Sequence, residues 1–545
     1  MKSLMSFVML SLVVTSLCGQ EFTRQDYLRG SITAARKWWD VQHYHLQIVV
    51  DPEKKYISGS NLMRYKVLSP YHELQIEMQQ PMKITRVLQD GEELSIRQEG
   101  FSHFIALKKP QTVDAVNEIL IEYSGYPQES KMPPWEGGIT WGRDLNGKHF
   151  VASSCQTEGP SLWWPNKDHP YDEAESLAMS VTVPDDLMNV SNGRLQKIDH
   201  DKKAKTKTFH WVVQNPINSY GVNINIGDYV HFHEKYNGEK GQLDCDYYVL
   251  SYNLEKAKEH FKDVPRMLEA FEHWFGPYPF YEDGYKLVEV PYLGMEHQSS
   301  VTYGNGYLKG YKGRDFSGSG WGLKFDFIII HESGHEWFAN NITSQDVADL
   351  WIHESFTNYS ESLFVDYHYG KKAGSEYVIG SRTRIRNQKT IIGPYNVYKT
   401  GDDIYFKGAN FLHTIRQIID DDKVWREILR GLNRDFYHQT VRTEQIEDYI
   451  NKRTKMDLRY IFDQYLRDIR IPNFEYYVRD GRLFYRWANT IAMFNMPLRV
   501  SFGDGKSLWL DPITSWRSMA LPKSFRQLKA DKNFYISTQN ILEDN

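Results

Sequence analysis

Hydrophobic and polar positions alternate along most of the first half of the chain. Residues 44–50 and 57–67 alternate on either side of a polar turn at 51–55, which predicts a long β-hairpin. Shorter alternating segments follow, interrupted by a loop-rich stretch at 127–142. The pattern predicts one large antiparallel β domain over residues 20–252.

The hydrophobic period changes to helical spacing at Leu254. Residues 254–275 predict one helix, which ends at Gly276-Pro277. Strand-like pieces follow at 286–290 and 299–303. Further helices are predicted at 350–368, 407–420, 423–433, 443–452 and 457–466. This region, residues 253–471, is therefore expected to be a mainly helical domain beside a small sheet.

The helical pattern stops at Ile471-Pro472-Asn473, and alternation resumes after it. Residues 474–478, 483–487 and 498–502 each read as a strand. A small β-sandwich is predicted over residues 472–545. The expected fold class is thus multidomain α+β, with a β domain, a helical domain and a terminal sandwich.

Composition limits the functions to consider. A chain of 545 residues is too long for one hydrophobic core. Its formal net charge of −5, without a basic stripe, gives no reason to expect nucleic acid or an anionic membrane as a partner.

The N-terminus has the features of a secretory signal. Lys2 precedes an apolar run from Leu4 to Leu17, too short to span a membrane, and cleavage after Gly19 is expected. Residues 1–19 are therefore predicted to be a signal peptide, and the mature protein to be periplasmic or secreted. Lipoprotein anchoring through Cys18 is less favoured, because the preceding leucine is bulkier than a lipobox prefers.

No other stretch of the sequence is long and apolar enough to predict a transmembrane helix. Removal of the signal leaves Cys155 and Cys245 in an exported protein. They could form a disulfide or remain buried thiols, and the sequence does not decide between the two.

A candidate metal site centres on His331, Glu332 and His335. Positions i and i+4 of a helix share one face, so both imidazoles can reach one cation. Glu354, on the next predicted helix, would complete a tetrahedral Zn²⁺ site with one open position, the pattern of catalytic zinc. Such a site, one Zn²⁺ per chain, lowers the pKa of bound water to about 7.

The surroundings of this motif favour a metal over the alternative, a surface helix with two unrelated histidines. The apolar run at 325–330 leads into the motif and Trp337-Phe338 follows it, which indicates a buried helix. Polar groups on a buried helix need a partner, because leaving them unpaired is costly.

Four segments together resemble the aminopeptidase N family of zinc peptidases, which includes the bifunctional leukotriene hydrolase. The family carries Gly-x-Met-Glu-Asn before the zinc helix, then Trp-x-x-Glu-x-Phe, then Tyr-x-Lys-Gly-Ala, and a substrate-pocket glutamine further upstream. The matching segments are Leu293-Gly294-Met295-Glu296-His297-Gln298, Trp351-Ile352-His353-Glu354-Ser355-Phe356, Tyr405-Phe406-Lys407-Gly408-Ala409 and the stretch after Gln156. The resemblance implies that the helical domain is thermolysin-like.

The resemblance also implies a role for each matching residue. Glu332 would be the general base and then the general acid, and Tyr405 would donate its hydroxyl to the oxyanion. Glu296 would anchor the free α-amine, as a carboxylate in a partly dry site does well. Glu361 would hydrogen-bond a ligand histidine.

Gln156, Gly294 and Met295 are expected to contact the substrate. The chain departs from the family at Leu293, His297 and His353, and it has Ala339 where the zinc helix normally carries glycine. These departures leave the side-chain preference open. The resemblance further leads us to expect a short form that lacks the family's large C-terminal helical domain, and therefore a more open site.

The sequence as a whole predicts an exported, monomeric zinc aminopeptidase whose partners are peptides with a free N-terminus. One alternative is a thermolysin-type endopeptidase, which uses the same zinc chemistry without an amine anchor. Another is a non-catalytic binding scaffold, although such a scaffold would not need all of these residues together. An additional epoxide hydrolase activity is not required by any sequence feature.

Overall fold

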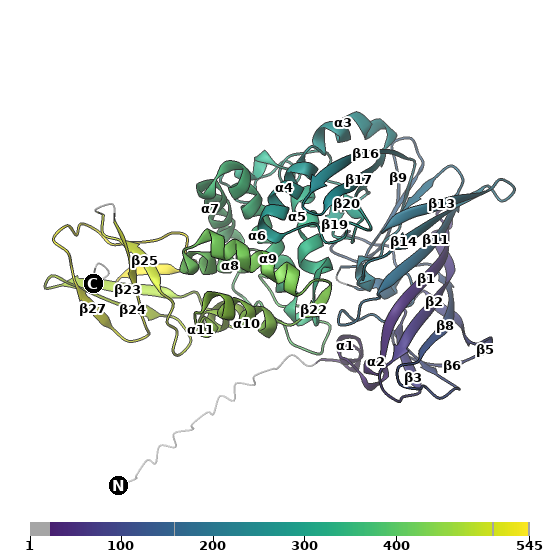
Figure 1. Cartoon of the computed structure of the whole chain (residues 1–545), viewed down its shortest axis with the longest axis horizontal. Coiled ribbons are helices and arrows are strands. Elements are labelled where there is room, and N and C mark those ends of the chain that lie inside the picture. The colour runs from purple at the N-terminus through teal and green to yellow at the C-terminus, as the bar shows by residue number, and fades with distance from the viewer. Residues whose placement is uncertain (1–21, 157, 504–505, 543–545) are drawn as a thin grey trace, which may run out of the picture.

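The computed structural model describes residues 22–156, 158–503 and 506–542, so the predicted signal peptide lies outside the described residues. Figure 1 shows a strand-rich N-terminal part, a helical part in the middle and a strand-rich C-terminal part at the opposite end. The predicted α+β class is confirmed. Among the described residues, none of the helices is both long and apolar enough to cross a membrane.

The N-terminal part is built on an eight-stranded sheet with the order β13-β14-β11-β1-β2-β8-β4-β5. The predicted hairpin is present as β1 and β2, and every pairing of this sheet is antiparallel except that of β1 with β11. The strands are β1 (Trp39–Asp51), β2 (Tyr56–Val67), β4 (Lys83–Gln89), β5 (Glu92–Glu93), β8 (Val116–Gly125), β11 (Ser176–Pro184), β13 (Arg194–Asp201) and β14 (Thr206–Val213).

Two smaller sheets and two short helices complete this part, and the strand β10 leads directly toward Gln156. One sheet has the order β3-β7-β6 and the other β12-β15-β10-β9. The elements are α1 (Arg24–Gly30), α2 (Ala34–Lys37), β3 (Glu73–Glu77), β6 (Ser95–Glu99), β7 (Ser102–Ala106), β9 (Gly138–Arg143), β10 (His149–Ser154), β12 (Met188–Val190) and β15 (Asn225–Gly227).

A five-stranded sheet, ordered β16-β17-β18-β20-β19, flanks the helices. The β16–β17 hairpin precedes residue 252, yet β17 pairs in parallel with β18 from beyond it. Hydrogen bonding therefore continues across the predicted domain boundary. The strands are β16 (Tyr229–Gly238), β17 (Gly241–Leu250), β18 (Tyr285–Glu289), β19 (Gly294–Met295) and β20 (Val301–Tyr303).

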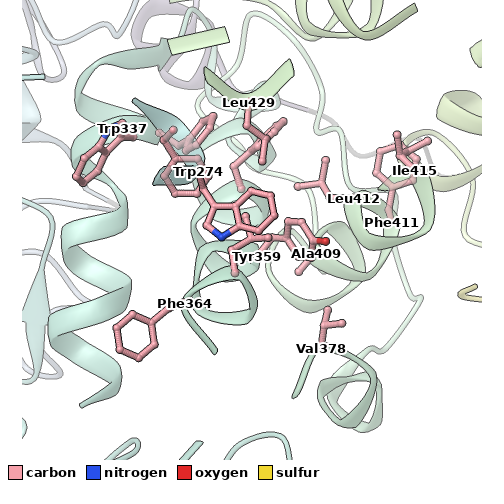
Figure 2. Packing of buried hydrophobic residues seen from close by; sticks show 14 of the residues in the cluster. Trp274, Trp337, Tyr359, Phe364, Val378, Ala409, Phe411, Leu412, Ile415 and Leu429 are labelled. Carbon is pink, nitrogen blue, oxygen red and sulfur yellow. The ribbon is translucent and has the colours of Figure 1, made fainter. Parts of the chain in front are cut away.

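The central helices pack around an aromatic and aliphatic core, part of which Figure 2 shows, including Trp274, Trp337, Tyr359 and Phe411. They are α3 (Leu254–His260), α4 (Asp263–Phe275), α5 (Phe327–Gly334), α6 (Trp351–Tyr369), α7 (Lys371–Gly380), α8 (Phe406–Ile419), α9 (Asp422–Asp435), α10 (Thr443–Thr454) and α11 (Arg459–Leu466). A short parallel pair joins β21 (Ile342–Ser344) to β22 (Gln439–Val441).

Two expectations about these helices are corrected. The single helix predicted over 254–275 is wrong, because the chain breaks between α3 and α4. Pro265, in the first turn of α4, has no amide hydrogen to donate to the Phe261 carbonyl, so one continuous helix cannot form here. The ring of Phe261, at this break, packs on Tyr247 and Tyr303 with centroids 5.5 and 5.2 Å away. Helix α7 was not predicted, since glycines inside and at both ends of it weaken its helical signal.

The C-terminal part consists of two small sheets, in agreement with the predicted β-rich end of the chain. Their orders are β27-β24-β23-β29 and β26-β25-β28. Hydrogen bonds from Tyr465 to the Tyr535 carbonyl (2.7 Å) and from Arg382 to the Lys532 carbonyl (2.8 Å) attach them to the helices. The strands are β23 (Asn473–Arg479), β24 (Arg482–Ala488), β25 (Leu498–Ser501), β26 (Ser507–Leu510), β27 (Arg517–Ala520), β28 (Lys529–Ala530) and β29 (Ser537–Asn540).

Candidate active site

Helix α5 carries the first two predicted ligands into the protein core. Asp326 caps its N-terminus, accepting the amide hydrogens of Ile328 (2.9 Å) and Ile329 (3.2 Å). His331 lies in the last turn and His335 directly follows the helix, both buried. Glu354 lies in the first turn of α6, which packs against α5 and directs its carboxylate toward the two imidazoles.

The hydrogen bonds of the two histidines fix which nitrogen is free. Nδ1 of His331 lies 2.8 Å from Oε1 of Glu361, and Nδ1 of His335 lies 3.0 Å from the Phe338 carbonyl oxygen. Both partners only accept, so each Nδ1 carries the hydrogen and each Nε2 keeps its lone pair. These Nε2 atoms lie 3.8 and 3.5 Å from Oε2 of Glu354.

His331, His335 and Glu354 could bind a metal ion, because some of their buried polar atoms lack hydrogen-bond partners. Nε2 of His335 and Oε2 of Glu354 are buried without a hydrogen-bond partner among the described residues. The ligand atoms of His331, His335 and Glu354 lie within 4.8 Å of one another, as do those of Glu296, Glu332 and His335. Two imidazoles and one carboxylate are donors that Zn²⁺ accepts.

Glu361 holds the orientation of His331. Its Oε1 accepts from His331 and from Nδ2 of Asn358 (2.8 Å), and its Oε2 accepts from the hydroxyl of Tyr377 (2.6 Å). Such partners fix the ring and raise its basicity as a ligand.

Glu332 lies beside the ligands in a dry environment. Burial, more than any neighbouring charge, raises the pKa of Glu332 to about 7, and the nearby carboxylate of Glu296 acts in the same direction. A carboxyl group whose pKa lies near neutrality can both take and return a proton there.

Tyr405 is placed by the close approach of α8 to α6. A Cβ on Gly408 would lie 1.7 Å from Oγ of Ser355, so only glycine permits this contact. The Ser355 hydroxyl also donates to the Ile404 carbonyl (2.6 Å), directly before Tyr405. Burial and then the charge of Glu354 raise the pKa of Tyr405 well above its usual value, which keeps the hydroxyl protonated as a donor.

Glu296 and Gln156 lie on the other side of the ligands. Nε2 of Gln156 lies 3.3 Å from Oε1 of Glu296 and 3.0 Å from Oε1 of Glu354, so it links the two carboxylates. Gly294 belongs to the edge strand β19, and a Cβ there would lie 2.5 Å from Ile328 of α5. Met295 is buried next to Glu296. The predicted residues thus come together from both halves of the molecule.

Two hollows meet at Glu296 and Gln156. The metal cleft, about 740 Å³ and open to solvent, is lined by Pro134, Trp135, Gln156, Leu293, Gly294, Glu296, Tyr311, Phe316, Phe327, Ile328, His331, Glu332, His335, Asn358, Tyr405 and Phe406. The side pocket, about 500 Å³ when the open solvent at its entrance is included, is lined by Gln156, Pro160, Asp168, His169, Pro170, Asn218, Ser219, Tyr220, Glu296, Ser344, Val347, Leu350, His353 and Tyr398.

Several residues of the site were not found from the sequence. Tyr377 lies on the unpredicted helix α7, and Tyr220 lies in a turn without any motif. Trp135 comes from the loop-rich stretch of the β domain and reaches the mouth of the metal cleft. Cys155 and Cys245, whose state was open, are both buried free thiols.

The arrangement is that of a gluzincin-type zinc site, in which a glutamate from a second helix completes the His-Glu-x-x-His pair of ligands. Residues 259–465 match the peptidase family M1 domain. The matched stretch contains the candidate ligands, Glu332 and Tyr405, so this comparison agrees with the resemblance to the aminopeptidase N family.

Individual relatives are distant. Leukotriene A-4 hydrolase of Xenopus laevis is 20% identical over 446 residues, which are 76% of this chain and 69% of that protein. Tricorn protease-interacting factor F2 of Thermoplasma acidophilum is 23% identical over 329 residues, 57% of this chain. The chain spans only 40% of the length of that factor, and 36% of mouse endoplasmic reticulum aminopeptidase 1.

The fold also matches solved structures. An M1 zinc metallopeptidase variant from Deinococcus radiodurans aligns with a TM-score of 0.67 at 19% identity. The alignment covers 80% of this chain and 96% of the Deinococcus chain. The architecture of the two proteins is therefore shared along most of both chains.

Proposed function

We propose that the protein is a zinc-dependent aminopeptidase that removes N-terminal residues from peptides. The observation that carries the proposal is the carboxylate of Glu296, which Gln156 links to the ligand Glu354 within 3.3 Å. A cationic α-amine held there would lie at a fixed, short distance from the metal, as an enzyme acting on the first peptide bond requires.

Bound Zn²⁺ would supply Lewis-acid polarisation of the scissile carbonyl and activation of water. His331, His335 and Glu354 would hold it. Glu332 then takes the proton of the attacking water on its carboxylate and returns it to the leaving amine. Its raised pKa suits both steps near neutral pH.

Tyr405 donates its hydroxyl hydrogen to the oxygen of the scissile carbonyl as negative charge develops on it. Its ring lies 6.2 Å from that of His331, at the wall of the metal cleft. One such donor is typically worth about 3–4 kcal/mol of barrier.

The endopeptidase alternative needs a cleft that continues on both sides of the scissile bond. Here a buried carboxylate, Glu296, stands on one side, and burial raises its pKa, a sign that the charge is costly without a cation. A peptide running through would leave that carboxylate unpaired. A non-catalytic scaffold would need neither Glu332 nor Tyr405.

The test compares aminoacyl fluorogenic amides with their N-acetylated counterparts, using metal-analysed protein. We expect cleavage of the free-amine substrates alone, abolished by a chelator and restored by zinc. Glu296→Gln should lower kcat/KM about 10²-fold for free amines, because a charge-assisted bond is lost. The matched control is Glu427→Gln, on the exposed face of α9. Cleavage of acetylated substrates at similar rates would indicate an endopeptidase.

Export and a monomeric state complete the proposal. Export rests on the sequence of residues 1–19 and is tested by fractionating cells that express the full chain. Light scattering on the purified protein tests the monomer.

A further inference from the structure

The side pocket opens beside the proposed amine anchor. It shares Gln156 and Glu296 with the metal cleft but extends away from Tyr405, between the β domain and helix α6. An amino acid whose ammonium group binds Glu296 and whose carbonyl faces the metal ligands must direct its side chain elsewhere. The side pocket is the cavity next to Glu296 that could receive this side chain.

The charges that line the side pocket are already neutralised. Asp168 accepts a hydrogen bond from Oγ of Ser161 (2.5 Å), and the cationic side chain of Arg29 offsets its charge. Nε2 of His169 lies 3.2 Å from the Gly30 carbonyl, which fixes that imidazole in the wall, and burial lowers its pKa well below the usual value. Among the lining residues, Glu296 alone is left to pair with a cation, and the α-amine uses it.

The remaining lining carries no charge, and it combines polar residues (Gln156, Asn218, Ser219 and Ser344) with apolar and aromatic ones. Pro160, Pro170, Val347 and Leu350 present carbon surfaces, and Tyr398 presents a ring, with the guanidinium carbon of Arg29 3.5 Å from its centroid. A charged side chain entering this pocket would lose its water and gain no counter-charge, which costs far more than a missing methylene.

His353 gives the pocket a feature of its own, since the family usually has asparagine at this position. Its Nε2 accepts the amide hydrogen of Ser344 at 2.7 Å, so the neutral ring carries its hydrogen on Nδ1. The ring lies nearly parallel to that of Tyr220, with centroids 6.5 Å apart and an interplanar angle of 13°. The two rings narrow the pocket and add aromatic surface.

We propose, building on the aminopeptidase function, that the side pocket receives the N-terminal side chain and selects a neutral apolar or aromatic one. His353 and Tyr220 act as specificity determinants through their rings, and Val347 and Leu350 form the apolar wall. Peptides that begin with arginine, lysine, aspartate or glutamate are poor substrates.

The experiment measures binding and turnover separately. The zinc-loaded Glu332→Gln variant is titrated calorimetrically with the amides of phenylalanine, leucine, arginine and glutamate, and the wild-type enzyme is assayed on the matching fluorogenic substrates. We expect phenylalanine and leucine to exceed arginine and glutamate by about 10²-fold in both affinity and kcat/KM. Equal or tighter binding of the arginine amide overturns the proposal, as does the absence of binding by every amide.

A substitution in the wall should weaken the expected selectivity. Val347→Glu places a carboxylate in the half-buried wall, and Val347→Gln is its neutral control. The ratio of arginine to phenylalanine affinity should rise at least about 10-fold with glutamate but not with glutamine. The same ratio in both variants would show that the side chain binds elsewhere.

A second variant tests the rings without adding charge. His353→Asn should reduce the preference for phenylalanine over alanine about 10-fold, because the pocket widens. An unchanged preference would remove His353 from the proposal. If the Glu332→Gln variant binds the phenylalanine amide selectively but the wild-type enzyme hydrolyses no substrate, the aminopeptidase function is rejected while the selectivity of the pocket stands.

Discussion

Two buried charged groups in this molecule differ in how completely their atoms are paired. In the N-terminal part, the ammonium of Lys167 contacts Asp172, donates to the Trp39 carbonyl (2.6 Å) and lies 4.0 Å from the Trp39 ring. Asp172 also accepts the Val41 amide hydrogen at 3.3 Å. In the metal cleft, by contrast, His335 and Glu354 each have one buried atom without a hydrogen-bond partner in the part of the chain that the structure describes.

The comparison separates two uses of buried polarity. A fully paired group stabilises one arrangement of the chain, whereas an unpaired buried atom costs free energy unless something from outside satisfies it. The Lys167–Asp172 pair is therefore structural, and the metal cleft is arranged for a cation. Substitutions in the two places should consequently affect different properties.

The largest expected effect is that of Glu332→Gln in the metal cleft. Loss of the proton acceptor should lower kcat by about 10⁴-fold, while zinc content and stability stay unchanged because Glu332 is not one of the three ligands. Steady-state kinetics and metal analysis check this. Turnover within 10-fold of the wild type would remove Glu332 from the role of base.

Lys167→Met should act on stability instead. It leaves the carboxylate of Asp172 buried without its cation, which typically costs about 3–5 kcal/mol of the free energy of unfolding. Zinc content should remain at one ion per folded chain. Denaturant unfolding measures the change, and Lys197→Met, in a pair exposed by 61% and 57%, is the control expected to cost less than about 1 kcal/mol. Equal losses in the two variants would contradict the comparison.

Glu361→Gln tests whether a carboxylate that is itself fully hydrogen-bonded contributes to metal binding by orienting a ligand histidine. Its carboxylate is satisfied by three partners, yet it orients a metal ligand. We expect zinc affinity to fall about 10–100-fold, as measured by competition with a chelator. Tyr377→Phe, which removes one of those partners, should have a smaller effect in the same direction. Unchanged affinity in Glu361→Gln would make the contact to His331 incidental.

Ala339→Gly should have the smallest effect. Ala339 follows the ligand helix with φ 151° and ψ −51°, a conformation that glycine adopts readily and alanine does not. The substitution should raise the free energy of unfolding by about 1 kcal/mol. Ala409→Gly, inside helix α8, is the matched control and should lower it by about the same amount. Destabilisation in both would show that the methyl group of Ala339 contributes more by packing than it costs in strain.

The sequence predicted those parts of the site that depend on local spacing. His331 and His335 are one helical turn apart, and the segments around Glu296, Glu354 and Tyr405 are continuous motifs. Residues that reach the site only through long-range packing are not marked by any local sequence pattern. Tyr377 reaches Glu361 only because α7 folds back on α6, and Tyr220 reaches the side pocket from a turn far away in the sequence.

The fold was predictable for a similar reason. The periods of two and 3.6 identified the β and helical regions, since each follows from the burial of one face of an element. Periodicity alone misses the break at Phe261, which follows from Pro265, because a proline cannot donate to the carbonyl four residues before it. The pairing of β17 with β18 was not predicted either, because tertiary structure rather than the local sequence pattern determines which strands pair.

That pairing has a consequence for how the molecule folds. The β16–β17 hairpin lies before residue 252 and is hydrogen-bonded to β18, so the two sides of this position share one sheet. A proteolytic nick in the turn at 251–253 would leave two fragments that complement each other rather than two independent modules. The β domain and the helical domain should accordingly melt in a single cooperative transition, and neither half expressed alone should retain its full structure.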